Sequence, residues 1–350
     1  MQVSDVAGNY TDGQYYALRI LTCAAAIVLS CAALCMLNYS TPVVLCCIAM
    51  MSYKIAECCA DVTLGAMQRR EQFQWVAISY TLRGLLPAAC FTVCLLAGCR
   101  LPIAVLCMTA VFLTCFLAFD VRKLWGTPQE ERALNFHGIQ SVANAAVPLM
   151  LVSLLDSVMV YIPRDAVERI YGSEALGFFS TISIVTVVFS TLGSGVWGSI
   201  APRISTMLLK NEDDQLKKLI GTVFALIGVG SVAALTAGKL LGPFFFQLVF
   251  GPQILDYMYL LSPVLINALL LLVNSFFHCL FIPMKKRKSL LCTDLAALGI
   301  CICCSYRLTE SLGLLGACFS LTLSLSVRAI LLTILLFRFW RNREKRTSNE

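Results

Sequence analysis

The stretch GTVFALIGVGSVAALTAGKLLGPFFF, at residues 221–246, carries a single charged side chain, Lys239. A helix needs about 20 predominantly apolar residues to cross a hydrocarbon core of about 30 Å. Across all 350 residues, 59% are hydrophobic and 13% are charged, and the mean hydropathy is +0.80. This composition excludes a water-soluble domain with a charged exterior, and it predicts that lipid surrounds most of the chain.

Similar apolar runs recur along the whole chain and predict ten membrane-spanning helices. The runs are long and the segments between them are short, so a helical bundle is favoured over a barrel, whose strands alternate weakly. The expected fold class is therefore an all-α, polytopic membrane bundle. Its predicted spans are residues 17–37, 41–67, 76–98, 101–119, 143–162, 175–199, 219–246, 257–282, 289–306 and 313–337.

The basic residues of the connecting segments predict the orientation of the chain in the membrane. With the N-terminus in the cytoplasm, 18 of these residues lie on the cytoplasmic side and 4 on the other side. Short cytoplasmic loops carry the excess of Lys and Arg, so both termini are expected in the cytoplasm. The net charge of +7 then reflects topology and contact with anionic membrane lipids, and no nucleic-acid partner is expected.

The longest polar stretch, DVRKLWGTPQEERALNFHGIQSV at residues 120–142, divides the bundle into four spans and then six. Its Gly-Thr-Pro triplet is a turn signal. We therefore expect an N-terminal transmembrane lobe at 1–119 and a cytoplasmic linker at 120–142. A C-terminal lobe of six helices follows at 143–337, and a basic cytoplasmic tail at 338–350.

The sequence lacks the signatures of soluble catalytic chemistry. Its 18 cysteines lie almost entirely inside the apolar runs, where a free thiol behaves as a small hydrophobe. Cys301 and Cys304 have C-x-x-C spacing but no second pair and no nearby His, which argues against a zinc or redox site. Neither a P-loop, nor H-E-x-x-H, nor G-x-S-x-G occurs. We expect no cofactor, no metal and no enzymatic activity.

The second span carries three ionisable residues on one side. Lys54, Glu57 and Asp61 lie at i, i+3 and i+7, which places them within a wedge of about 60° on a helix. Charges in a span are costly unless they face protein or water, so we expect the three to share one interior face. Two interpretations stay open: Lys54 and Glu57 neutralise each other, or the carboxylates of Glu57 and Asp61 couple transport to an ion.

Arg83 in the third span and Arg328 in the last have no acidic residue at i±3 or i±4 in their own helices. An arginine keeps its charge at neutral pH, and inside a span it usually marks an anion or a water-filled cavity. Its guanidinium meets phosphate oxygens through two parallel hydrogen bonds. We predict that both arginines face the cavity between the lobes and bind an anionic substrate. The alternative is that each pairs with a carboxylate of a neighbouring helix, Asp156 being one candidate.

Two other spans carry polar stripes. Interhelical hydrogen bonding explains most Asn, Ser and His residues in such positions, whereas Asp156 is a further ion-coupling candidate and Arg164 a further anion-binding candidate. Arg19 and Lys239 lie near span ends, where snorkelling explains them. The stripes consist of Ser153, Asp156, Ser157 and Arg164 in the fifth span and of Asn267, Asn274, Ser275 and His278 in the eighth.

Four stretches of the chain resemble polysaccharide and O-antigen flippases of the multidrug/oligosaccharidyl-lipid/polysaccharide superfamily. The longest is SVMVYIPRDAVERIYGSEALGFFSTISIV at 157–185, in which an apolar helix ends in an Ile-Pro-Arg turn that an acidic piece and a Gly-rich motif follow. The others are YYALRILT at 15–22, KIAECCADVTLGAMQRREQF at 54–73 and SYTLRGLL at 79–86. Family members usually have about twelve helices, so the resemblance leads us to expect that the counterparts of the first two are missing from this sequence.

The resemblance implies a flippase fold like that of multidrug and toxin extrusion (MATE) transporters and a location in the bacterial inner membrane. It implies that an undecaprenyl pyrophosphate-linked oligosaccharide, such as an O-antigen unit of lipopolysaccharide, enters between two lobes that alternate their access. Glycosyltransferases and a polymerase of the same pathway are the implied partners. The substrate-binding candidates are Lys54, Arg83, Arg164 and Arg328, and the ion-coupling candidates are Glu57, Asp61 and Asp156.

Two other functions are compatible with the sequence. A MATE antiporter of the same superfamily exports organic cations and should present an acidic cavity, whereas the isolated charges inside the spans here are mostly basic. A non-transporting subunit of a glycan assembly complex is the second alternative. Reconstitution with a labelled lipid-linked glycan distinguishes such a subunit from a flippase.

Overall fold

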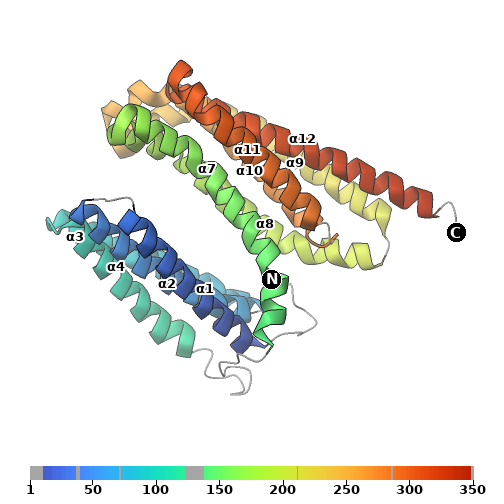
Figure 1. The fold of residues 1–350 in the computed structure, drawn as a ribbon, viewed down its shortest axis with the longest axis horizontal. Coiled ribbons are helices and arrows are strands. Elements are labelled where there is room, and N and C mark those ends of the chain that lie inside the picture. Colours follow the sequence, from blue (N-terminus) through green and yellow to red (C-terminus); the bar gives the residue numbers. More distant parts are fainter. Residues whose placement is uncertain are drawn as a thin grey trace. The chain divides into compact units, whose positions relative to one another are not determined.

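The computed structural model describes residues 11–36, 40–70, 72–122, 138–210, 212–284 and 287–347, and every regular element in these ranges is a helix (Figure 1). In the hydrocarbon core no water is available to the backbone, so each N–H must find its acceptor within the protein. A helix satisfies this requirement within its own segment. The elements are α1 (Asp12–Met36), α2 (Thr41–Arg69), α3 (Phe73–Leu96), α4 (Leu101–Cys115), η2 (Phe116–Val121), α7 (Ile139–Ile182), α8 (Ile184–Leu209), α9 (Asp213–Phe250), η3 (Pro252–Leu260), α10 (Leu261–Phe281), α11 (Arg287–Leu312) and α12 (Leu314–Thr347).

In these ranges nine helical segments are long and apolar enough to cross a membrane. One of them, Ile139–Leu208, is 70 residues long and contains α7 and α8, so it has room for two crossings. The hydropathy-based prediction of a polytopic helical bundle with about ten spans is confirmed.

Three predicted boundaries differ from the structure. Pro163 and Arg164, expected to form a turn, lie inside α7, because a proline can bend a helix without ending it; the break in α7 falls at Gly172, whose φ of 85° suits glycine. Asp120, expected in the linker, belongs to η2. The basic tail expected from residue 338 continues α12 to Thr347, since Arg, Lys and Glu are good helix formers.

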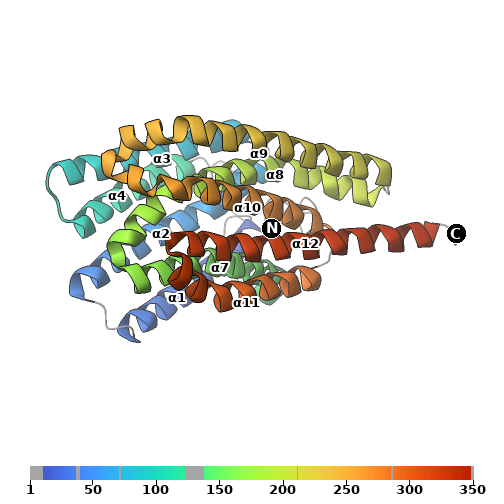
Figure 2. The same cartoon turned by 90° about the horizontal axis from the view of Figure 1, so that it is seen from above.

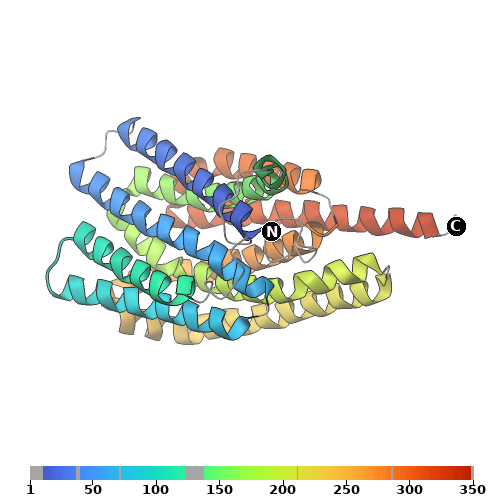
Figure 3. The same ribbon diagram turned by 90° about the horizontal axis from the view of Figure 1, so that it is seen from below.

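The chain divides into two compact units, Met1–Val147 and Pro148–Glu350. In the first unit α4 packs against α2 and α3, and α1 packs against α2; Figure 3 shows these four helices. Ala56 and Ala60 are buried on α2, and their small side chains let Phe112 of α4 pack closely, edge to face with Tyr53 at 5.2 Å between ring centroids.

In the second unit α10 is the central helix and packs against α8, α9 and α12, while α11 packs along α12. The side-chain amides of Asn267 and Asn274 donate to the backbone carbonyls of Cys318 and Leu325 on α12, at 3.1 and 3.2 Å. The interhelical hydrogen bonding predicted for this stripe is therefore present. Figure 2 shows α12 extending beyond the other helices of this unit toward the C-terminal end.

The α11–α12 hairpin depends on a close backbone approach at Gly316. A β-carbon built on Gly316 would lie 1.8 Å from the carbonyl oxygen of Leu308. Because that atom belongs to the backbone of α11, the hairpin itself must open to admit a methyl group.

We expect Gly316→Ala to destabilise the protein by about 3 kcal/mol, the upper part of the usual range for overpacking. Gly299→Ala on α11 is the matched control, since a β-carbon at Gly299 would meet nothing within 4 Å. Thermal unfolding midpoints of the purified proteins in detergent measure the difference. Equal midpoints for the two alanine variants would show that the close approach does not constrain the hairpin.

Candidate functional site

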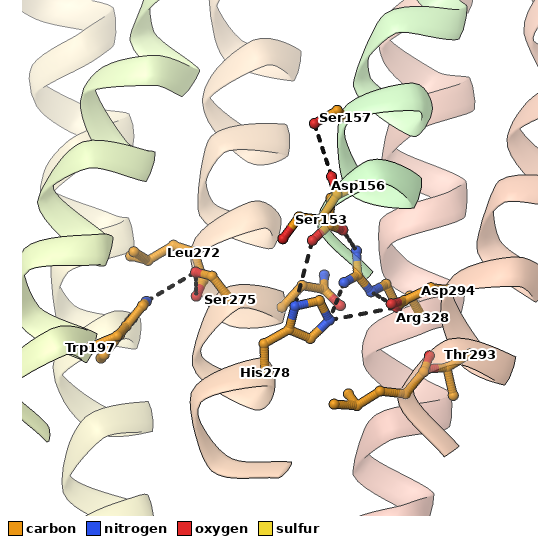
Figure 4. A network of polar contacts seen from close by, with 12 residues as sticks. Ser153, Asp156, Ser157, Trp197, Leu272, Ser275, His278, Thr293, Asp294 and Arg328 are labelled. Atoms are coloured by element: carbon orange, nitrogen blue, oxygen red, sulfur yellow. Dashed lines mark hydrogen bonds and ion pairs between the residues drawn. The ribbon is translucent and has the colours of Figure 1, made fainter. Parts of the chain in front are cut away.

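Arg328 lies at the centre of a charged cluster inside the second unit (Figure 4). Its side chain is 1% exposed. Its Nε lies 2.8 Å from Oδ1 of Asp294, one terminal nitrogen donates to Oδ1 of Asp156, and the other contacts Nε2 of His278. We call Asp156, His278, Asp294 and Arg328 the Arg328 cluster.

Four helices supply the Arg328 cluster, one residue each. Asp156 comes from α7, His278 from α10, Asp294 from α11 and Arg328 from α12. The approach to Arg328 along α12 is lined by small hydroxyl residues, because Ser320 and Ser324 precede it at four-residue spacing and are both fully buried. This stripe of serines leaves space for a guanidinium between the helices.

The members of the Arg328 cluster differ in access to the surroundings. The side chain of Asp294 is fully buried, that of His278 is 13% exposed, and that of Asp156 is 35% exposed. Asp156 is therefore the most accessible member of the Arg328 cluster. A carboxylate in a span avoids hydrocarbon, so the exposed edge of Asp156 marks a hydrated surface.

A second buried pair lies in the first unit. Nε of Arg83 is 3.3 Å from Oδ2 of Asp120, with side-chain exposures of 6% and 0%. The guanidinium also lies 5.8 Å from the ring centroid of Tyr80 and 5.3 Å from that of Phe112, within range of cation–π attraction. The π-helical turn η2 continues α4 far enough to include Asp120, and such turns often occur at functional positions.

These two clusters change the interpretation of Arg83 and Arg328. The sequence leads us to expect exposed, uncompensated guanidinium groups that bind an anion. The structure instead buries both and pairs each with a carboxylate of a neighbouring helix, which is the alternative left open above. In this conformation neither guanidinium is accessible to a large substrate.

Lys54, Glu57 and Asp61 share one face of α2, as predicted, but that face is not buried. Nζ of Lys54 lies 2.6 Å from Oε2 of Glu57, and the two side chains are 61% and 40% exposed. Asp61 is exposed as well, with Arg19, Lys54 and Arg83 within electrostatic range of its carboxylate. The helices of the first unit therefore do not cover this face, and the predicted interior position stays a prediction.

Arg164 is the candidate arginine without a carboxylate partner in the described part of the chain. It is half-buried and lines a small pocket between α7, α8, α10 and α12. Ser183, Thr186 and Asn267 supply the polar groups of that pocket. An arginine beside hydroxyl and amide groups is a suitable site for a phosphate or carboxylate oxygen.

A groove of about 780 Å³ lies between α9, α10 and α12 of the second unit. Its walls are apolar and aromatic, and its edge carries two cations, Lys217 and Arg341. Nζ of Lys217 lies 5.0 Å from the ring centroid of Trp340. This volume is within the range of small-molecule sites, and the combination suits an apolar chain with an anionic end. The walls consist of Ile220, Gly221, Phe224, Phe277, Thr333, Leu336, Phe337 and Trp340.

Sequence reasoning missed two residues of these clusters. Asp294 lies inside the apolar run 289–306, where a charged residue by itself indicates a paired or functional position. Asp120 stands at the boundary between a span and a polar stretch, where hydropathy does not decide which side a residue joins. Among the residues that the structure describes, no three His, Cys, Asp or Glu side chains are grouped to hold a metal ion.

Comparison with solved structures defines the class of fold. An outward-facing multidrug resistance MATE family transporter of the MOP superfamily matches with a TM-score of 0.72 and 12% identity, covering 99% of this chain and 81% of that chain. A MATE structure in the bent conformation matches with a TM-score of 0.70 and 12% identity, over 100% and 86% of the two chains. An inward-facing multidrug resistance MATE family transporter matches with a TM-score of 0.69 and 13% identity, covering 99% of this chain and 89% of that chain. The protein therefore has the MATE fold, as expected, and is a multi-pass membrane protein.

One curated protein is similar in sequence. The capsular polysaccharide biosynthesis protein CapF of Staphylococcus aureus is 23% identical over 284 residues, which are 79% of this chain and 70% of CapF. No family model matches the chain.

Proposed function

We propose that this protein translocates a lipid-linked oligosaccharide across the bacterial inner membrane for the synthesis of a surface polysaccharide. The groove between α9, α10 and α12 carries the proposal, because its apolar walls and cationic edge fit a lipid with a phosphate at one end. The MATE fold and the similarity to CapF support it. The carrier that combines these features is undecaprenyl pyrophosphate, and the O-antigen or capsular unit is its cargo.

The residues divide into three roles. Arg164 has no carboxylate partner in the described part of the chain and lines a separate small pocket, so it stays an anion-binding candidate, whereas Lys217 and Arg341 at the edge of the groove are assigned to the pyrophosphate. Lys54, with its neighbouring carboxylates Glu57 and Asp61, lies on the water-facing surface of α2 along which the glycan passes. Arg83 and Arg328 hold helices together through their carboxylate partners instead of contacting the substrate. The groove lies at the end of the second unit that holds the start of α9 and the end of α12, which we assign to the cytoplasm.

The test is reconstitution of the full chain in liposomes that contain a fluorescent undecaprenyl pyrophosphate-linked oligosaccharide. We expect the wild type to move the label between leaflets. The charge-reversed variant Lys217→Glu/Arg341→Glu should lose at least about tenfold in rate, because each cation near a membrane contributes about 1 kcal/mol toward an anionic head group.

The matched control is Lys218→Glu/Arg338→Glu, which has the same charge change on exposed residues of the same two helices. It should keep the wild-type rate. Equal loss in both double variants would show that net charge, and not the groove, determines translocation.

Export of organic cations is the second candidate, favoured by the exposed carboxylates of Glu57 and Asp61 on α2. Ethidium accumulation in the same liposomes measures it. Ethidium transport without glycan translocation would replace the proposal. If neither substrate moves with folded protein in the membrane, a non-transporting role in a glycan assembly complex is the correct interpretation.

A further inference from the structure

We infer that the pocket beside Arg164 binds a small monovalent anion, with chloride as its occupant, and that the bound anion stabilises the second unit. The inference goes beyond the proposed function, because this pocket is separate from the groove assigned to the lipid. It follows from the uncompensated charge of Arg164, from the hydrogen-bond donors around the pocket, and from the size of the pocket.

The guanidinium of Arg164 has no partner that neutralises its charge. No hydrogen bond or ion pair joins it to any residue that the structure describes. The carboxylate next to it in sequence, Asp165, is engaged elsewhere: its Oδ2 accepts from the hydroxyl of Tyr306 and lies 3.0 Å from Nε of Arg169. An arginine stays charged at neutral pH, and a charge removed from water without a partner is costly. A negative ligand removes this cost.

The pocket lies in the interior of the second unit. Phe179 and Val264 on its wall belong to one hydrophobic core cluster, and Leu321 belongs to another, against which Leu271 packs. These apolar walls do not compensate a positive charge, so the compensation has to come from the content of the pocket. Arg164 itself is only half-buried, which leaves a way for an ion to enter.

The polar groups around the pocket have hydrogen-bond donors to spare. The hydroxyl of Ser183 makes no capping bond at the start of α8, whereas that of Thr186 already donates to the Ser183 carbonyl. The amide of Asn267 uses one of its two N–H bonds on the carbonyl of Cys318, and its oxygen accepts from Thr322. Together with the five N–H bonds of a guanidinium, the remaining donors suit a ligand that only accepts hydrogen bonds, as a halide ion does.

The size of the pocket selects among anions. Its volume is about 20 Å³, against about 780 Å³ for the groove, and one water molecule needs about 10–15 Å³ on the same scale. A monatomic ion fits into this space, whereas a whole phosphate, pyrophosphate or sugar does not. One guanidinium also balances only one negative charge. Chloride meets both conditions.

An anion in this position would be shared by three parts of the second unit. Arg164 belongs to α7, Ser183 lies between α7 and α8, and Asn267 belongs to α10. Asn267 is in turn hydrogen-bonded to α12 through the carbonyl of Cys318. The bound ion would therefore tie α7 to the central helix of the unit. A water molecule in its place would use the donors but leave the charge of Arg164 uncompensated.

Thermal unfolding of the full chain in detergent tests the site. Protein in sodium gluconate, whose anion is too large for the pocket, is titrated with sodium chloride at constant ionic strength. The unfolding midpoint should rise and then saturate, because a ligand that binds only the folded protein stabilises it. Bromide should act as chloride does, and inorganic pyrophosphate should not. A wild-type midpoint that ignores chloride would overturn the inference, as would an equal rise with pyrophosphate.

Variants of the pocket connect this response to Arg164. Arg164→Gln removes the charge and should abolish the chloride response, whereas Arg203→Gln, at an exposed arginine of α8, should keep it. Arg164→Lys keeps the charge but loses the planar fork, so its half-maximal chloride concentration should rise at least about tenfold. Ser183→Ala removes a single donor and should raise that concentration by a smaller factor. A wild-type chloride response in Arg164→Gln or in Arg164→Lys would refute the assignment.

Equilibrium binding of radioactive chloride to the same purified proteins measures occupancy directly. We expect one saturable ion per chain in the wild type and in Arg203→Gln, and none in Arg164→Gln. Saturable binding that is equal in all three proteins would place the ion elsewhere and contradict the inference. None of these measurements needs a lipid-linked glycan, so the proposed function stands or fails separately.

Discussion

Replacing Arg328 by leucine should remove most of the folded protein, with a loss of about 3–5 kcal/mol in the free energy of unfolding. The cause is Asp294, which is fully buried and would be left without its cation. Breaking one partner of a buried ion pair typically costs this much, whereas replacing both partners by apolar groups costs little. Arg328→Leu/Asp294→Leu should therefore recover most of the folded protein.

The measurement is the yield of monodisperse protein in detergent together with its thermal midpoint. Arg338→Leu is the control, because Arg338 lies on the same helix and is exposed; it should behave as the wild type. If the double variant is as unstable as Arg328→Leu, the two side chains do not depend on each other, and the Arg328 cluster is not an electrostatic unit.

Asp120→Leu should have a comparable effect in the first unit. It leaves the guanidinium of Arg83, 6% exposed, without its adjacent counter-ion; the aromatic neighbours and the more distant carboxylate of Asp61 contribute less than a carboxylate in contact. We expect a loss of about 3 kcal/mol, and recovery in Asp120→Leu/Arg83→Leu. The same detergent assay measures both variants.

Asp61→Leu is the matched control, since Asp61 is an exposed carboxylate of the same unit and its removal should change stability by less than about 1 kcal/mol. A larger loss in Asp61→Leu than in Asp120→Leu would contradict the assignment of Asp120 as the structural counter-ion. Specific transport activity of the double variant, normalised to protein abundance, then shows whether Arg83 has a role beyond folding.

The helical fold was predictable from hydropathy because apolar length is a local property of the chain. Pairing of charges was not predictable in the same way. Asp156 and Arg328 are separated by 172 positions, so only the packing of α7 against the helices of the second unit brings them together. Sequence reasoning recognised both residues as unusual and named their pairing as an alternative, but it could not choose between a partner and a substrate.

Other differences between sequence and structure have local causes. The face of α2 that holds Lys54 and Asp61 was correctly inferred from helical periodicity, but periodicity does not say what covers a face. The family resemblance places a turn at Pro163, yet the positive φ that breaks α7 occurs at Gly172. Arg164 was assigned as an anion-binding candidate because it is a charged residue on a polar stripe of the fifth span, whereas its lack of a carboxylate partner is evident only in the folded, described part of the chain.

The close contact at Gly316 makes this end of the α11–α12 hairpin the joint about which the two helices would open. The backbones are held together at one end, where a β-carbon on Gly316 would collide with Leu308. Arg328 lies twelve residues further along α12, which at 1.5 Å per residue is about 18 Å from the joint. Opening the hairpin by about 3° at this joint would then separate Arg328 from Asp294 by about 1 Å, which weakens their ion pair. Any opening at this joint would therefore displace α12 most where it continues past Arg328 toward the cationic edge of the groove.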